Sequence, residues 1–237
     1  MKYELQTIPV WKAFEADPEC VLCHLEQESE QRNTTFFLGS SVMAPEMRVR
    51  LNEHGFCRRH FHMLLGGQGK LGYSLALRTH LDTLAERYAR DERSIVAARG
   101  RGARKVVEEY AAELRRQETD CLMCDRMRAN MLNFTYTIAK LFLDEGEFVK
   151  ALSGSRGFCL HHLPGLLEMG LEVIPAKSLP GWHETLFELQ RANVNRTRAD
   201  LEAFTWQFDY QTEQKTPPEA QDAVPRAVQR LAGYGPR

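Results

Sequence analysis

The chain has 237 residues, of which 43% are hydrophobic and 27% are charged, and its formal net charge at pH 7 is −1. This composition is ordinary for a soluble globular protein, and the near-zero charge argues against a general polyanion binder. The opening MKYELQTIPVWKAF lacks the apolar core of a signal peptide, and no stretch has the roughly 18 consecutive apolar residues of a membrane span. We therefore expect a cytoplasmic protein.

The first predicted element is a helix over residues 22–38, which would be about 25 Å long at about 1.5 Å per residue. The segment GSSVMAP would then turn the chain, and Pro45 would begin a return helix that ends near Glu53. Gly55 would free the backbone there, so that Cys57 comes back beside Cys20. Residues 1–99 thus begin with a helical hairpin.

Helical periodicity continues over residues 71–92 and again over residues 104–116. The intervening segment RSIVAARGRGARK contains Gly100 and Gly102, which disfavour a continuous helix. We place a module boundary near residue 100.

A second hairpin is predicted to mirror the first. Its outgoing helix would cover residues 123–143, its turn residues 144–146, and the segment SGSRG would precede Cys159. A further helix is expected over residues 178–210, with Pro180 in its first turn. The tail from residue 211 onward contains four prolines and few large apolar residues, so we expect residues 211–237 to be flexible.

The cysteines repeat between the two halves of the chain. Cys20 and Cys121 are 101 residues apart, and the motif GFC-x-x-H recurs at an offset of 102 residues. Every cysteine has a counterpart, which is the signature of a repeated structural unit. The sequence therefore predicts an all-α protein built by tandem duplication, with modules at residues 1–99 and 100–210 followed by the tail.

Each predicted module offers three cysteines and one histidine. A Cys-x-x-Cys pair at a turn can direct two sulfurs at one point, and a Cys-x-x-His pair can complete the tetrahedron that zinc prefers. We expect two structural Zn²⁺ ions per chain, one at the base of each hairpin, and each contributing on the order of 10 kcal/mol to folding. The expected ligands are Cys20, Cys23, Cys57 and His60 in the first module, and Cys121, Cys124, Cys159 and His162 in the second.

Other chemistries fit parts of this pattern. A Cys-x-x-Cys pair alone is also a thiol–disulfide redox motif, but that reading leaves the two Cys-x-x-His pairs unexplained. An iron–sulfur cluster with three cysteines and one histidine is chemically allowed. The ligands could also be shared across the modules in a cross-braced arrangement. Local closure of each hairpin is the simpler scheme.

No catalytic constellation stands out in the sequence. Four protein ligands close a zinc site, so the ions would stabilise rather than catalyse. Glu26 and Glu30 share a helix face at a spacing of four residues, which is typical of a solvated surface but is also compatible with an active site. His161, next to His162, is expected to face solvent or to support the metal site. Basic residues gather over 87–105, diluted by nearby acids.

The opening MKYELQTIPVW, together with the two Cys-x-x-Cys and two GFC-x-x-H motifs, resembles an uncharacterised bacterial family of unknown function over roughly residues 1–210. The resemblance implies a bacterial cytosolic protein and no particular activity. We therefore expect a zinc-stabilised interaction protein with a protein or small-molecule partner. The alternatives are an enzyme or small-molecule binder with a site between the modules, and a nucleic-acid-binding module that uses residues 87–105.

Overall fold

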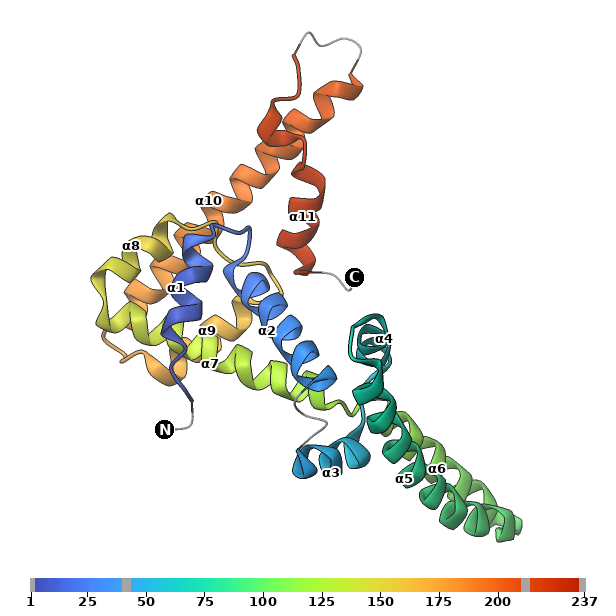
Figure 1. Ribbon diagram of the computed structural model, residues 1–237. Coiled ribbons are helices and arrows are strands. Elements are labelled where there is room, and N and C mark those ends of the chain that lie inside the picture. Colours follow the sequence, from blue (N-terminus) through green and yellow to red (C-terminus); the bar gives the residue numbers. More distant parts are fainter. Residues whose placement is uncertain (1–2, 40–43, 210–213, 235–237) are drawn as a thin grey trace. The chain divides into compact units, whose positions relative to one another are not determined.

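The computed structural model describes residues 3–39, 44–209 and 214–234 (Figure 1). Over these residues the chain forms eleven α-helices, two short 3-10 helices and no strand, which confirms the predicted all-helical class. None of the described helices combines the length and the apolar character needed to cross a bilayer.

The chain divides into two compact units. One unit, the terminal unit, comprises residues 1–28 and 129–237, and the other, the inserted unit, comprises residues 29–128. The expected modules were residues 1–99 and 100–210, whereas the structure joins residues 1–28 with residues 129–237. The second half of α2 and the first part of α7 belong to the inserted unit.

The terminal unit is built around large buried side chains from several helices. Trp182, Phe148 and Phe158 are fully buried, and Trp11 and Phe14 pack edge-on against Phe148. Its helices are α1 (Thr7–Glu15), the start of α2 (Val21–Leu38), most of α7 (Leu122–Asp144), α8 (Gly146–Gly154), α9 (Leu163–Val173), α10 (Leu179–Thr205) and α11 (Ala223–Ala232). Two 3-10 helices, η2 (Trp206–Phe208) and η3 (Pro218–Ala220), follow α10.

The inserted unit has a smaller core. Phe37, Phe56 and Phe61 form an edge-to-face aromatic row, and Leu64 and Met123 are completely buried beside it. Its remaining helices are α3 (Pro45–His54), α4 (Arg58–Gly66), α5 (Lys70–Ala97) and α6 (Gly100–Thr119). The expected helices over 71–92 and 104–116 thus correspond to α5 and α6, and the break between them lies at residues 98–99, just before Gly100.

The tail differs from the expected flexible segment where it is described, while residues 211–213 and 235–237 lie outside the described residues. Helix α11 packs against α10 through small side chains, and Ala220 and Ala223 are fully buried. The tail has few large apolar residues, but alanines allow close helix packing without them.

A buried ion-pair network anchors α11 to the rest of the terminal unit. The Glu19 carboxylate, 7% exposed, accepts hydrogen bonds from Arg196 at 2.6 Å and from Arg230 at 3.0 Å. Arg230 also donates to the carbonyl oxygens of Arg156 and Phe158. Burial opposes ionisation of Glu19, but hydrogen bonds and charges from Arg196, Arg156 and Arg230 outweigh it and lower its pKa, so the carboxylate is ionised at neutral pH.

Replacement of this carboxylate should strongly destabilise the terminal unit. Glu19→Gln leaves the buried guanidinium of Arg230 without its counter-charge, which costs about 3 to 5 kcal/mol for a buried pair. Asp17→Asn is the matched control, because Asp17 also pairs with Arg156 but is half-exposed and should cost less than about 1 kcal/mol. Urea unfolding at pH 7 measures both, and equal effects of the two variants would contradict the network's role.

Candidate metal centres

The eight predicted ligands gather into two groups, each of three cysteines and one histidine. The terminal cluster contains Cys20, Cys23, Cys159 and His162, and the inserted cluster contains Cys57, His60, Cys121 and Cys124. Within each cluster the ligand atoms all lie within 4.8 Å of one another. Each cluster lies entirely within one unit and could hold a metal ion.

The clusters combine the ligands differently from the expected scheme, in which each hairpin holds its own ion. The Cys-x-x-Cys pair of each half of the chain meets the Cys-x-x-His pair of the other half, so the expected grouping of Cys20 and Cys23 with Cys57 and His60 is wrong. The lengths of the helices explain the difference. Helix α2 has 18 residues and spans about 27 Å, whereas the return helix α3 has 10 residues and spans about 15 Å.

In the second hairpin the outgoing and return helices differ even more in length. Helix α7 has 23 residues, about 35 Å, and α8 has 9 residues, about 14 Å. Neither return helix is long enough to bring the chain back to the start of its own hairpin. The cross-braced arrangement follows.

In the terminal cluster the distances match those between ligands of a tetrahedral zinc. Zinc–sulfur bonds of about 2.3 Å and zinc–nitrogen bonds of about 2.0 Å place sulfurs about 3.8 Å apart and sulfur about 3.6 Å from nitrogen. The Sγ atoms of Cys23 and Cys159 are 3.6 Å apart. The Nδ1 atom of His162 lies 3.4 Å from the Sγ atom of Cys23 and 3.2 Å from that of Cys159, and its distance to the Sγ atom of Cys20 is 3.7 Å.

The inserted cluster repeats this geometry. The Sγ atoms of Cys57 and Cys124 are 3.9 Å apart, and the Nδ1 atom of His60 lies 3.2 to 3.4 Å from all three sulfurs of its cluster. A disulfide would need about 2.05 Å between sulfurs, and all six cysteines are free thiols. The spacing therefore fits two ligand sets around an ion better than oxidised pairs.

Local sequence positions each ligand pair. Cys20 and Cys121 immediately precede helices, and their Sγ atoms lie 3.4 and 3.5 Å from the backbone N–H groups of Cys23 and Cys124. Each Cys-x-x-His pair follows a Gly-Phe dipeptide whose glycine has a positive φ, 69° at Gly55 and 75° at Gly157. A side chain at Gly55 would be strained by this backbone conformation and would meet the His80 ring at 3.0 Å.

Both histidines have the same orientation. Nδ1 faces the three sulfurs, and Nε2 faces a carboxylate, that of Glu30 at 3.2 Å from His60 and that of Glu26 at 3.5 Å from His162. Metal-bound histidines usually direct their other ring nitrogen to such a partner, which fixes the ring and raises its basicity as a ligand. Glu30 is also held by Arg59 at 2.6 Å.

The role of the two glutamates as supporting residues was not predicted from the sequence. The spacing of Glu26 and Glu30 predicted a solvated face or a possible active site, but each faces a different cluster histidine. Their spacing of four residues on the helix that follows Cys20 was visible in the sequence. Which histidines they approach depends on the exchange of ligand pairs, which the sequence does not reveal.

Electrostatics in the metal-free clusters favour one thiolate beside one imidazolium. The hydrogen bond from Cys124 lowers the pKa of Cys121 to about 3 against the opposing effect of burial, with help from His60. Burial opposes protonation of His60, but hydrogen bonds to Cys121 and Glu30 raise its pKa to about 9. The pKa of Cys124 is raised, chiefly by its hydrogen bond to Cys121 and by burial. Three adjacent thiolates would need a cation to neutralise them.

The terminal cluster follows the same rule and is more enclosed. Hydrogen bonds from Cys20 and Cys23 lower the pKa of Cys159, and His162 has its pKa raised to about 11 by the sulfurs and Glu26 despite burial. All four of its residues are buried, whereas Cys57 and Cys124 of the inserted cluster are half-buried. The start of the loop after α11 lies over the terminal cluster, since a Cβ atom at Gly233 would be 3.5 Å from the Sγ atom of Cys159.

Among the described residues, a third group of potential ligands consists of Glu26, His161 and His162 and has no cysteine. His161 is exposed and packs edge-on against His162 with 4.8 Å between the ring centroids, close to Glu26, in agreement with its expected supporting or solvent-facing position. This third group shares His162 with the terminal cluster.

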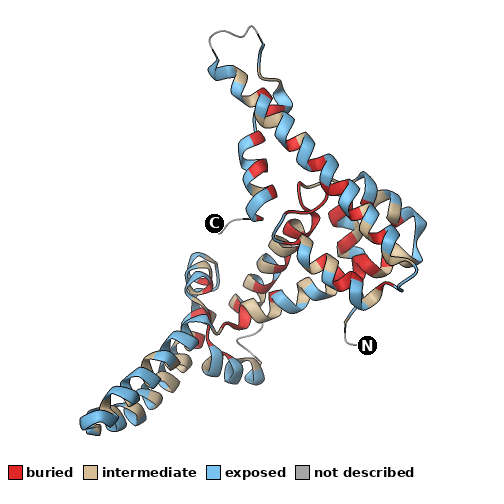
Figure 2. Ribbon diagram, turned by 180° about the vertical axis from the view of Figure 1, so that it is seen from behind, coloured by how far each residue is buried: buried red, intermediate tan, exposed pale blue. Residues whose placement is uncertain are grey.

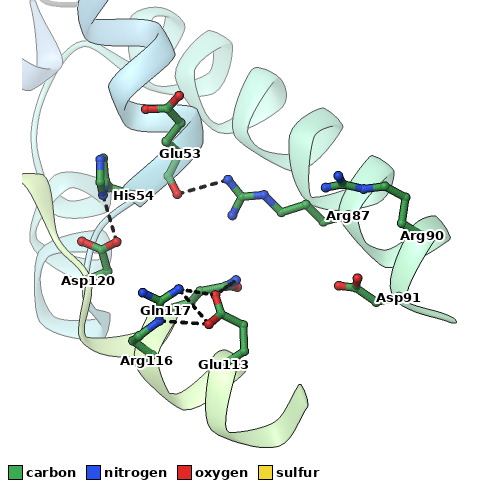
Figure 3. A pocket seen from close by; sticks show the side chains of 9 residues that line it. All are labelled: Glu53, His54, Arg87, Arg90, Asp91, Glu113, Arg116, Gln117 and Asp120. Atoms are coloured by element: carbon green, nitrogen blue, oxygen red, sulfur yellow. Dashed lines mark hydrogen bonds and ion pairs between the residues drawn. The ribbon is translucent and has the colours of Figure 1, made fainter. Parts of the chain in front are cut away.

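A pocket in the inserted unit is lined mostly by charged residues outside the clusters (Figure 3). Its side chains come from α3, α5 and α6, and they largely neutralise one another. His54 pairs with Asp120 at 2.9 Å, and Arg116 binds Glu113 through two nitrogens. Such mutual pairing is typical of a surface ion-pair network rather than of an acid–base pair prepared for catalysis.

Comparison with known proteins identifies the family of this chain. Neither a curated protein nor a solved structure matches the chain. A family model described as a family of unknown function, DUF6062, matches residues 1–237, which agrees with the resemblance seen in the sequence. This protein, with its two potential metal-binding clusters of three cysteines and one histidine, belongs to the DUF6062 family of unknown function.

Proposed function

We propose that the protein is a non-enzymatic interaction protein whose two helical units are each held together by one structural Zn²⁺ ion. The observation that carries this proposal is the matched geometry of the clusters. Two separate sets of three sulfurs and one Nδ1 atom have the spacing of a zinc tetrahedron, and each histidine is backed by a carboxylate.

The ligand count supports a structural role for the ions. A catalytic zinc keeps a coordination position open for water or substrate, whereas each cluster supplies four protein ligands. The terminal cluster is also buried on every ligand, which denies a substrate access to the metal. Zinc would thus act by joining segments that are distant in sequence, such as Cys20 and Cys159.

The paired motifs further support an origin by duplication. In each unit a Cys-x-x-Cys pair at the start of a long helix meets a Cys-x-x-His pair that follows a Gly-Phe turn. We propose that one ancestral hairpin was repeated in tandem, and that the two copies then came to share ligands across the chain. Each zinc would therefore bridge one segment from each copy.

Metal analysis tests the proposal directly. Protein purified without added metal should contain close to two zinc ions per chain by elemental analysis, one for each cluster. Cobalt substitution should give the intense ligand-to-metal absorption of a thiolate-rich tetrahedral site. Fewer than two equivalents of bound metal, or the visible absorption of an iron–sulfur cluster, would contradict it.

The carboxylate behind each histidine gives a second, site-resolved prediction. Glu30→Ala should weaken zinc binding at the inserted cluster about 10- to 100-fold, because the His60 ring loses the partner that orients it. Glu28→Ala is the matched control on the same helix, since Glu28 is half-exposed and pairs with His24. Competition with a chromophoric chelator measures both affinities. If the two variants bind zinc equally well, Glu30 does not support the metal.

A further inference from the structure

Helices α5 and α6 form a long antiparallel hairpin in the inserted unit with almost no core of its own (Figure 1). Helix α6 has no buried residue, and α5 buries only Tyr73 and Ala76 near its start. The hairpin accordingly shows half-buried and exposed residues along most of its length in Figure 2. A pair of helices cannot enclose a core, whereas four helices can.

Several apolar residues of the hairpin gather on one side, which we call the apolar face. Leu84 and Tyr88 of α5 line one hollow together with Leu114 of α6. Helical spacing of seven residues places Leu81 beside Tyr88, and Val107 beside Leu114. The exposed fractions of four of these side chains are 61% for Leu81, 50% for Tyr88, 48% for Val107 and 37% for Leu114.

The pocket of Figure 3 is a second hollow of the hairpin, which shares Arg87 and Gln117 with the first. Its other lining residues are mostly charged, among them Asp91, Glu113 and Arg116. The hairpin therefore carries a charged hollow and, next to it, an apolar face whose outer side chains nothing else in the described part of the inserted unit covers. Amphipathic helices of this kind normally bury their apolar stripe against another element.

The charge of the hairpin also changes along its length. The tip, residues 93–105, has five basic residues and no acidic one. The stem, residues 78–92 and 106–120, has five arginines against nine acidic residues, a net charge of −4. Two hairpins side by side in the same direction would bring like charges together, whereas an antiparallel arrangement places each basic tip along an acidic stem.

We propose that the apolar face of the α5–α6 hairpin binds the same face of a second copy of this chain, and that the two hairpins form an antiparallel four-helix bundle. A two-fold axis makes the contact self-complementary, as in most homodimers. The overlap is limited by α6, about 30 Å long, and by the width of two helices, about 20 Å. About 600 Å² per copy, or about 1,200 Å² in total, reaches the lower limit of specific interfaces.

This inference names one partner for the interaction protein proposed above but does not depend on zinc, because the hairpin contains no ligand of either cluster. The interface is small, so we expect a reversible dimer that forms at micromolar protein concentrations. Analytical ultracentrifugation of the full-length, zinc-loaded protein over a range of concentrations measures the equilibrium. The zinc content of the same sample is determined in parallel.

Variants on the apolar face separate dimer formation from folding. Leu81→Glu combined with Val107→Glu should raise the dimer dissociation constant at least about tenfold, because both side chains are exposed in the single chain and would become buried charges in the dimer. Leu171→Glu in the terminal unit is the matched control, since Leu171 is an equally exposed leucine on a helix outside the hairpin. Circular dichroism and zinc content should stay unchanged in both variants.

Salt dependence tests the antiparallel orientation. Attraction between tip and stem is screened by salt, so raising the ionic strength should raise the dissociation constant, and Arg101→Glu with Arg104→Glu should raise it as well. A folded protein with two zinc ions that stays monomeric at high concentration would overturn the dimer and leave the zinc proposal intact. A dimer that tightens with salt, or one that the apolar-face variant leaves unaffected, would also overturn the proposed dimer. So would a monomer that binds nucleic acid through the tip.

Discussion

Chelation of the metal is expected to unfold both units of the protein. The clusters lie inside the hydrophobic cores, since Cys20, Cys23 and Cys159 belong to the core of the terminal unit, and Cys121 belongs to that of the inserted unit. Each zinc ion proposed here would contribute on the order of 10 kcal/mol, which is comparable to the entire stability of a typical domain. The metal-free units should therefore lose most of their helical circular dichroism at 25 °C.

Both the lost metal–ligand bonds and the electrostatics of the sulfurs favour unfolding after chelation. One zinc would join Cys20 to Cys159, which are 139 residues apart, so its removal restores a large amount of chain entropy to the unfolded state. It also leaves the sulfurs in contact without a cation, where the hydrogen bond to Cys159 raises the pKa of the Cys23 thiol. Chelator that has been saturated with zinc beforehand is the control. A helical signal and a thermal midpoint that survive complete demetallation would show that the cores fold without the ions.

Single cysteine substitutions are expected to act on units rather than on halves of the sequence. Cys57→Ser and Cys121→Ser should both destabilise the inserted unit, because the two sulfurs lie in one cluster. The two residues nevertheless come from different halves of the chain. Hydrogen–deuterium exchange should show faster exchange over residues 29–128 in both variants, at a cost on the order of 10 kcal/mol to that unit. Cys20→Ser and Cys159→Ser should instead affect residues 1–28 and 129–237.

Each pair of variants serves as the control for the other. If Cys57→Ser and Cys20→Ser gave the same exchange pattern, the ligands would be grouped by hairpin and not as the structure groups them.

Local features of the fold could be predicted because they depend on local sequence. Helical periodicity and Pro45 gave helices that correspond closely to α2 and α3, although residues 40–43 of the expected turn lie outside the described residues. The two-residue spacing of the cysteine and histidine pairs identified all eight cluster residues. Family membership was also visible in these motifs.

The arrangement of these elements could not be predicted in the same way. Choosing between local and shared ligands requires knowing where each hairpin ends, and that depends on how far the return helices α3 and α8 fall short of α2 and α7. The division into a terminal and an inserted unit follows from this exchange. The roles of Glu26 and Glu19 also depend on tertiary contacts, since their partners are 136 or more residues away.

The zinc content of two double variants tests the exchanged ligand sets most directly. Cys20→Ser with Cys159→Ser alters the terminal cluster alone, so this variant should retain one zinc per chain, whereas Cys20→Ser with Cys57→Ser alters both clusters and should retain none. If the second variant kept one zinc and the first kept none, each hairpin would bind its own ion and the grouping described here would be wrong.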